Sequence, residues 1–229
     1  MEVGKEYRKK LKENLTSIGE LLYKINNMDN ARDKALVSFL YMTGCRIEEV
    51  VKFKRKVCFE CGEKIKYVHT TKEGDIVKHY INWCHKCKKE VNHIWKVLGE
   101  PIKKFQIEFK ENSMLITQVR SLKRGEWMPR NIPIPYIKEQ EFINIFKNYI
   151  DTLEDGAVLF PFSRERAHQI VKKIGLHCHH FRHLRSTRLA TEYGFNAADI
   201  KQHHGWSSSK PADTYVHLNW QYLEKKMLK

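Results

Sequence analysis

The sequence lacks a long hydrophobic run, a hydrophobic leader and any tract of low complexity. A helix that crosses a bilayer needs about 20 consecutive apolar residues, and no stretch of the 229 residues approaches that composition. The first residues, 1–6, contain no apolar signal core. We therefore expect a folded protein of the cytoplasm that has no part embedded in a membrane.

Negative charge is also in short supply. The chain has 27 Asp and Glu against 42 Lys and Arg, which gives a formal net charge of +15. The cations are spread along the chain instead of forming one tail. Such a balance favours an anionic partner, with nucleic acid ahead of an anionic membrane surface. A solvated, lysine-rich surface without a partner is the plain alternative.

Six cysteines are present, and four of them form two Cys-x-x-Cys pairs. The pairs are Cys58 with Cys61 and Cys84 with Cys87. In a reducing compartment this pattern favours a metal site over disulfides. Four thiolates can surround one Zn²⁺ as a tetrahedron and leave no open position, so the sequence predicts one structural zinc ion. Four reduced thiols or a redox pair are the alternatives.

Other residues of these types have plainer interpretations. His69, His79 and His85 are the nearby substitutes for a cysteine ligand, but we interpret them first as surface residues. The remaining cysteines, Cys45 and Cys178, are interpreted as small buried packing residues.

The segment that carries the cysteine pairs, 52–90, is dense in lysine and differs in character from its surroundings. A basic segment of this size has too small a hydrophobic core to fold without a stabilising cross-link, which a zinc ion would supply. We interpret 52–90 as an inserted, zinc-ribbon-like module. Its lysines favour contact with phosphates, and a protein partner is the alternative.

Outside this module, residues 1–51 and 91–229 are predicted to form one domain with an α+β fold, mostly α-helical with a small antiparallel sheet. An amphipathic helix is expected within 1–27 and another over 31–42, ended by Gly44. The later elements are predicted as alternating strands at 105–116, a basic hairpin turn at 121–131, a proline-containing edge strand at 132–135, helices at 139–150, 163–174, 180–193, 196–203 and around 215, and a basic amphipathic tail at 220–229.

Three short motifs with candidate catalytic residues follow one another along the chain: Thr43-Gly44-Cys45-Arg46-Ile47-Glu48-Glu49, then His179-His180-Phe181-Arg182-His183, then Gly205-Trp206 with Tyr215. Planar guanidinium groups match two non-bridging phosphate oxygens with paired hydrogen bonds and stay charged at any working pH. A tyrosine hydroxyl can hold a phosphate as an ester, although its proton, with a pKa of ~10, needs an acceptor. Together the motifs supply the parts that break a phosphodiester without a metal ion.

In their order and spacing, these motifs resemble those of the tyrosine recombinase, or phage-type integrase, family. The resemblance covers the chain from about Ala35 to its end, apart from the insert. It implies a tyrosine-recombinase-like catalytic domain, here with an inserted zinc ribbon.

Carried over to these positions, the resemblance implies a role for each motif residue. Tyr215 attacks the scissile phosphate, and Arg46 and Arg182 bind its non-bridging oxygens. His179 takes or relays the tyrosine proton. Trp206 stands where many members have histidine, and its indole N–H can donate a hydrogen bond to the phosphate.

The family's catalytic lysine lies on a hairpin turn between the two arginine motifs. Arg120, Lys123 and Arg124 are the candidates, and we choose Lys123 because lysine is a better acid than arginine. Glu49 matches a supporting acidic position and is expected to orient Arg46.

The resemblance implies a site-specific recombinase or integrase that cleaves and rejoins double-stranded DNA through a 3′-phosphotyrosyl intermediate, with no catalytic metal. It also implies a homotetramer on two duplexes, linked by a C-terminal helix, in a cytoplasmic, nucleoid-associated location. A non-catalytic DNA-binding regulator and a type IB topoisomerase-like relaxing enzyme are the alternatives. Too few residues precede the first matched helix for the family's usual clamp domain, so we expect the 1–27 helix to pack on the catalytic domain or touch DNA.

Several residues near the motifs have plain interpretations. A lone tyrosine on a C-terminal helix is usually a core or surface residue. We interpret His183, His203 and His204 as packing residues or groups behind the catalytic ones. Tyr222 is rejected as the nucleophile because its spacing from Gly205 does not fit the motif.

Overall fold

Helix α3 (Ala31–Thr43) is the centre of the body, because almost every side chain from Ala35 to Thr43 is buried. The side chain of Asn30 caps its start by accepting hydrogen bonds from the backbone N–H groups of the first turn. Gly44 ends the helix in the left-handed conformation, with φ of 60°. Both the predicted span and the predicted stop are confirmed.

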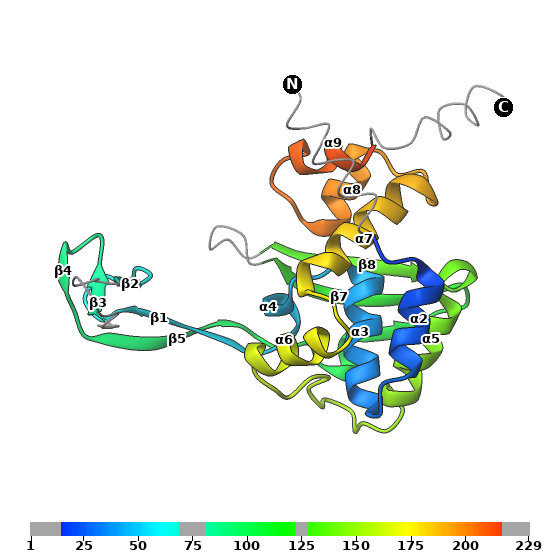
Figure 1. The fold of residues 1–229 in the computed structure, drawn as a ribbon, viewed down its shortest axis with the longest axis horizontal. Coiled ribbons are helices and arrows are strands. Elements are labelled where there is room, and N and C mark those ends of the chain that lie inside the picture. The colour runs from blue at the N-terminus through cyan, green and yellow to red at the C-terminus, as the bar shows by residue number, and fades with distance from the viewer. Residues whose placement is uncertain (1–14, 69–80, 122–127, 217–229) are drawn as a thin grey trace, which may run out of the picture.

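The structure is a computed structural model and describes residues 15–68, 81–121 and 128–216. The helices of the body are α2 (Ile18–Asn26), α3, α4 (Ile47–Val50), α5 (Tyr136–Ile150), α6 (Arg164–Lys173), α7 (Cys178–Thr191), α8 (Ala197–His204) and α9 (Lys210–Val216), with a 3₁₀ turn at Lys104–Gln106. Helices α2 and α5 lie beside α3, while α7, α8 and α9 stack above them toward one end of the body (Figure 1). None of these helices is long and apolar enough to cross a membrane.

Aromatic rings fill the space between α3 and its neighbours. The rings of Phe39 and Phe146 lie 5.3 Å apart between centroids, and those of Tyr41 and Phe142 lie 4.1 Å apart. Both pairs join α3 to α5 and are fully or almost fully buried. Large apolar side chains of this kind dominate the stability of a core, so the start of α4, just after α3, has a rigid support.

A three-stranded antiparallel sheet covers another side of the core. Its strands are β6 (Ile107–Phe109), β7 (Ser113–Ser121) and β8 (Met128–Pro135), in the order β6-β7-β8. Strand β8 is an edge strand, as its prolines predicted. Ile132 and Ile134 of β8 point into the core.

A second, two-stranded ribbon extends from the body (Figure 1). Strands β1 (Phe53–Cys58) and β5 (His93–Gly99) pair in an antiparallel register, and β1 begins directly after α4. The ribbon ends in a small tip with strands β2 (Lys66–Val68), β3 (Ile81–Cys84) and β4 (Lys89–Glu90). The ribbon is closed by β5, which lies beyond the predicted end of the insert at 90, because a chain that leaves through one strand returns through its partner.

The helices near the C-terminal end follow their predicted signals. The side chains of Ser163 and Asn196 cap α6 and α8, and Gly205 ends α8 with φ of 61°. The first part of the predicted 1–27 helix and the predicted tail at 220–229 lie outside the described residues.

Candidate functional site

The loop between α3 and α4 brings the first motif against α7, at Arg182 and Arg185. Arg46 is the N-cap residue of α4, and its side chain is 29% exposed. Gly44, two residues earlier, is required by the packing as well as by its φ of 60°, because a Cβ there would lie 2.5 Å from a ring carbon of His204. The Nη1 atom of Arg182 donates a hydrogen bond to the Gly44 carbonyl at 2.9 Å. The first two motifs, far apart in the sequence, are therefore in direct contact.

Glu49 is a buried carboxylate that gathers arginines from three elements. Its Oε2 accepts hydrogen bonds from the Arg46 backbone N–H at 3.1 Å and from Arg130 Nη2 at 2.9 Å. Arg182 Nη1 lies 4.0 Å from the same oxygen, and Arg46 Nη1 lies 3.5 Å from Oε1. Burial alone would raise the pKa of Glu49, but the charges of Arg130 and Arg182 outweigh it and hold the pKa below its ordinary value. Glu49 therefore remains an anion that positions these cations.

Arg130 is a site residue that the sequence interpretation missed. It lies on β8, and its side chain is 8% exposed. A signal was available, because side chains alternate between the two faces of a strand. Arg130 shares its face with Ile132 and Ile134, which are buried, so a cation in this register had to be buried with a partner.

Arg182 is held in one position on α7. Its Nη1 and Nη2 atoms donate to the carbonyls of Gly44 and His204, at 2.9 and 3.2 Å. Its guanidinium lies 5.2 Å from the centre of the Trp206 ring. Burial, followed by the opposing effects of Glu49 and Arg46, lowers the pKa of Arg182 to about 10, so the group stays charged at neutral pH.

Trp206 connects this arginine to the tyrosine. Its ring stacks on His204 at 4.8 Å and on Tyr215 at 6.4 Å, between centroids. His204 is itself anchored, since its Nε2 lies 2.7 Å from the Ser186 hydroxyl on α7. The Gly-Trp turn is thus packed between α7 and α9 and is anchored to α7.

The hydroxyl of Tyr215 lies 2.6 Å from Nδ1 of His183. Tyr215 is on α9 and is 6% exposed. Burial and then the charges of His179, His177 and Arg182 lower the pKa of His183, which favours the neutral ring that can accept a proton. His183 was expected to be a packing or supporting residue, and the structure places it in contact with the candidate nucleophile.

His179 is exposed and lies among the cations of the site. Burial of part of its ring, followed by the charge of Arg46, lowers its pKa, and Arg182 adds to this effect. The structure therefore brings Arg46, His179 and Arg182 together, while the contact with the Tyr215 hydroxyl is made by His183.

Lys123 and the neighbouring candidate Arg124 lie outside the described residues. Arg120 lies on β7, where it pairs with Pro129 of β8. Residues 128–131, which were predicted as part of the hairpin turn, lie in β8, and the role of Lys123 stays a prediction.

The four cysteines of the two pairs converge at the tip of the ribbon. Their Sγ atoms all lie within 4.8 Å of one another, with Cys58 3.8 Å from Cys87 and Cys61 3.4 Å from Cys84. Bonds of about 2.3 Å to a tetrahedral zinc ion would place the sulfurs about 3.8 Å apart, so the donor set fits this metal. His85 is exposed and is not part of the cluster, while His69 and His79 lie outside the described residues.

The two other cysteines are buried, as predicted. Cys45 accepts a hydrogen bond from Arg130 at 3.5 Å, and burial raises the pKa of its thiol. Cys178 lies 3.2 Å from Nδ1 of His168, and burial raises its pKa to about 11. A protonated thiol is a poor nucleophile, so neither cysteine is a candidate for the chemistry.

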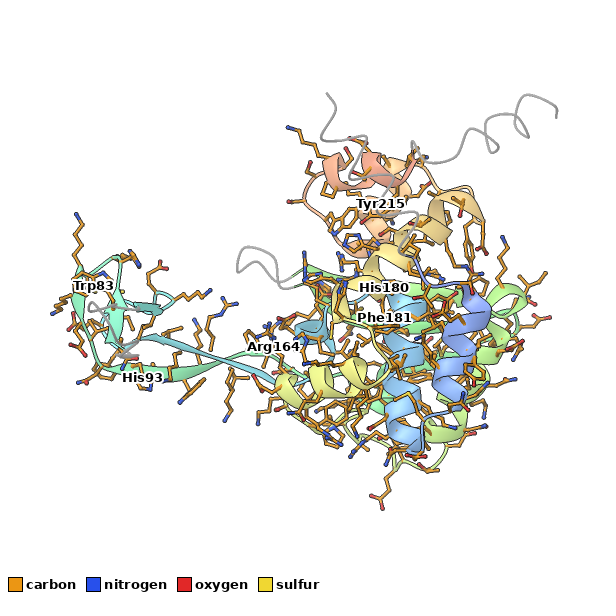
Figure 2. The ribbon with its side chains drawn as sticks, in the orientation of Figure 1. Trp83, His93, Arg164, His180, Phe181 and Tyr215 are labelled. Carbon is orange, nitrogen blue, oxygen red and sulfur yellow. The ribbon has the colours of Figure 1, made fainter. Side chains whose placement is uncertain are left out.

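Figure 2 shows how these regions are distributed. Tyr215 lies among the C-terminal helices, above His180 and Phe181 of α7. Trp83 and His93 lie toward the far end of the ribbon, and Arg164 lies where the ribbon joins the body. The candidate active site and the cysteine cluster are therefore separate sites.

The fold is similar to those of solved recombinases. The crystal structure of XerA recombinase matches with a TM-score of 0.52 and 18% identity, over 93% of this chain and 61% of that one. XerH site-specific recombinase, bound to palindromic difH substrate in a post-cleavage complex, matches with a TM-score of 0.50 and 13% identity, over 93% of this chain and 52% of that one. The chain thus spans between about half and three fifths of the length of these recombinases.

No curated protein sequence matches the chain. The profile of the phage integrase family matches residues 13–221, which is most of the chain. The match includes all three motifs and the site built around Glu49, Arg182 and Tyr215. The expected α+β fold with its small antiparallel sheet is confirmed. The chain belongs to the phage integrase family, whose members are tyrosine recombinases.

Proposed function

We propose that this protein is a site-specific DNA recombinase that cleaves and rejoins double-stranded DNA through a 3′-phosphotyrosyl intermediate. The observation that carries the proposal is the arrangement around Tyr215. Its hydroxyl contacts His183 at 2.6 Å, and its ring stacks on Trp206, which in turn lies against Arg182. A nucleophile, a proton acceptor and a buried cation are thus linked in one site.

In this proposal Tyr215 Oη attacks the scissile phosphorus, and the bond from phosphorus to the 5′ oxygen breaks. The tyrosine proton passes to Nδ1 of His183, which replaces His179 as the acceptor because it makes the contact. The 5′ oxygen leaves with a proton from Lys123. Rejoining is the reverse, in which a 5′ hydroxyl attacks the phosphotyrosyl bond and releases Tyr215.

Arginines neutralise the phosphate in this scheme. Arg46 and Arg182 contact its two non-bridging oxygens, and the partial exposure of Arg46 leaves it accessible to DNA. Glu49 holds both cations against their mutual repulsion. The indole N–H of Trp206 adds a third donor. Because these groups supply the charge, the proposed reaction needs no metal ion.

The cysteine cluster has a structural role in this proposal. Cys58, Cys61, Cys84 and Cys87 would hold one Zn²⁺, and with four protein ligands the ion has no open position for substrate. The proposed zinc-stabilised module then begins at 52, as predicted, and extends past 90 to the end of β5 at Gly99, because β5 pairs with β1. The supporting observation is the spacing of the four sulfurs.

The proposed partner is double-stranded DNA, and the proposed assembly is a homotetramer on two duplexes. The likeness to XerH recombinase, which was crystallised with a DNA substrate, supports the first part. The net charge of +15 supports it as well.

Covalent capture of DNA tests this proposal. A nicked duplex that loses its 5′ end after cleavage would trap the protein on DNA, and the adduct should form in EDTA. Tyr215→Phe should abolish the adduct, and Tyr222→Phe is the matched control that should keep it. Sequencing the trapped DNA would give the target site.

The outcomes separate the alternative functions. Strand exchange between two duplexes supports the recombinase. An adduct with relaxation of supercoils but no exchange would indicate a topoisomerase-like enzyme. DNA binding without any adduct would indicate a regulator and would contradict the proposed chemistry.

A further inference from the structure

The ribbon formed by β1 and β5 has exposed side chains on both of its faces. Ile94, Trp95 and Val97 of β5 are 46%, 58% and 49% exposed. Lys54 and Arg55 of β1 are exposed as well. An isolated two-stranded ribbon is marginally stable in water, and apolar groups of this size are usually covered. The ribbon therefore has the character of a surface that contacts another molecule.

The charge of the ribbon favours an anionic partner. Neither strand contains an acidic residue, while together they contain Lys54, Arg55, Lys56 and Lys96. The pairing register places Arg55 directly opposite Lys96 on one face. Like charges in such a cross-strand pair destabilise a sheet. This cost is offset when a polyanion lies against the strands.

The other face of the ribbon combines a cation with an aromatic ring. Lys56 is paired with Trp95, and its Nζ lies 5.4 Å from the centre of the Trp95 ring. Lys54 is paired with Val97 on the same face of the ribbon. Basic groups interleaved with aromatic ones favour nucleic acid over a small anion.

The root of the ribbon is fixed beside the candidate active site. Arg164 of α6 bonds Glu48 of α4 at 2.8 Å and lies 5.4 Å from the centre of the Phe53 ring at the start of β1. Glu48 is close in sequence to Arg46, which begins α4. The root of the ribbon is thus held next to α4 and α6, where Figure 2 labels Arg164.

We propose that the ribbon of β1 and β5 is a DNA-binding arm that lies along the duplex beside the cleaved phosphate. This inference rests on the proposed function, because that function places a scissile phosphate at Arg46. Six residues of β1 span about 20 Å at ~3.3 Å per residue, which is about six base pairs. A two-stranded ribbon is also narrow enough for the major groove, which is about 12 Å wide.

The tip has a supporting role in this arrangement. Its described surface is mixed in charge, and Lys89 bonds Glu60 at 2.9 Å. The cysteine cluster closes the end of the ribbon, where Cys58 is the last residue of β1. The tip therefore stabilises the pairing of the two strands, and the strands carry the contacts to DNA.

A pair of matched variants tests the arm. Arg55→Gln with Lys96→Gln removes two charges from the ribbon. Lys110→Gln with Lys147→Gln removes two charges from the body, one directly after β6 and one on α5. Both control lysines are exposed and each has a carboxylate within 4 Å. Affinity for a random-sequence duplex is measured by fluorescence anisotropy at several salt concentrations, with Tyr215→Phe in every protein so that cleavage does not contribute.

The ribbon variant should bind at least about fivefold more weakly, and its salt slope should fall by about 1.8, which is ~0.9 for each lost phosphate contact. The control should change neither quantity. Equal affinity and equal slope for the ribbon variant and the parent would overturn the proposal.

Arg55→Glu separates DNA binding from folding. It places opposite charges across the strands at Lys96, so thermal stability should stay the same or rise while DNA affinity falls. A loss of affinity that follows only from loss of folding would contradict the arm.

A photo-crosslinking side chain in place of Trp95 gives a direct readout, with the exposed Phe109 as the control position. Crosslinks to DNA are expected from position 95 and not from 109. A crosslink from 95 to a second protein molecule in place of DNA would overturn the proposal. Failure of the catalytic proposal is distinguishable, because it would remove the covalent adduct of the wild-type protein and leave these binding results unchanged.

Discussion

The candidate active site and the ribbon are both rich in positive charge, but they hold it in opposite ways. At the site, Arg130 and Arg182 are buried and are fixed by Glu49 and by backbone carbonyls. On the ribbon, Arg55 and Lys96 are exposed and face each other across strands without an acidic residue. Fixed cations favour catalysis, because they need no reorganisation when charge develops. Exposed cations favour affinity, because they can neutralise the charges of a phosphate backbone.

Substitution of His183 should give the largest difference between the two regions, because it should affect catalysis and not DNA binding. We expect His183→Ala to slow adduct formation by about 10²–10⁴-fold, the usual contribution of a general base, with DNA affinity unchanged. The measurement is the single-turnover rate on the nicked duplex. His179→Ala is the matched control. A larger loss of rate in His179→Ala than in His183→Ala would show that His179 is the proton acceptor, as first predicted from the sequence.

The pH dependence of the same rate gives a second readout. The pKa of His183 is lowered, so the neutral ring persists below pH 6.5 and the rate should fall only at more acidic pH. The residual rate of His183→Ala should lack this acidic limb. If the rate of His183→Ala still falls at acidic pH, the group responsible for that fall is not His183.

Glu49→Gln tests whether the negative charge of Glu49 is required for the stability of the buried arginines. The change leaves Arg130 and Arg182 buried without a counter-charge, so the free energy of unfolding should fall by about 3–5 kcal/mol. Urea unfolding measures the loss. Glu48→Gln is the control, because Glu48 is partly exposed and pairs with the partly exposed Arg164, where the expected loss is about 0–1 kcal/mol.

Removal of the metal should affect the ribbon and spare the body. Cys58→Ser, or a strong chelator, should lower DNA affinity to the level of the Arg55 and Lys96 variant, about fivefold. The main unfolding transition should be unchanged, since the core around α3 contains no cysteine of the cluster. Loss of that transition would mean that tip and body fold as one unit.

The last expected effect concerns the dependence of stability on acidic pH. Burial lowers the pKa values of His203 and His204 well below 6.5. The unfolded chain therefore binds more protons, and stability is fully present above pH 6.5 and is lost as the pH falls below it, by up to about 1.4 kcal/mol per histidine per pH unit. His85 is exposed, so His85→Gln should leave this slope unchanged while His204→Gln reduces it. Urea unfolding between pH 7 and pH 5 measures the slope.

Local signals in the sequence were sufficient for most elements. The cap residues Asn30, Ser163 and Asn196 and the stops Gly44 and Gly205 act on their nearest neighbours, so their effect is readable from a short window. The prolines of β8 likewise marked an edge strand. The spacing of the cysteine pairs indicated a cluster because each knuckle is a local turn.

Other features depend on contacts between distant segments. The pairing of His183 with Tyr215 requires the angle between α7 and α9, and no local pattern distinguishes His183 from His179. The burial of Arg130 against Glu49 depends on how β8 packs on α4. The opposition of Arg55 and Lys96 depends on the register of two strands that are separated by the whole tip.

The sequence by itself determined the chemistry that this protein has available: a tyrosine, two motif arginines, a histidine cluster, four paired cysteines and an excess of basic residues. These follow from residue types and short spacings. The tertiary structure decided which histidine contacts Tyr215, which carboxylate holds the arginines, and that the insert is a long exposed ribbon. The physical reason is that hydrogen bonds and ion pairs between distant elements depend on packing geometry to within about an ångström, which short-range spacing does not encode.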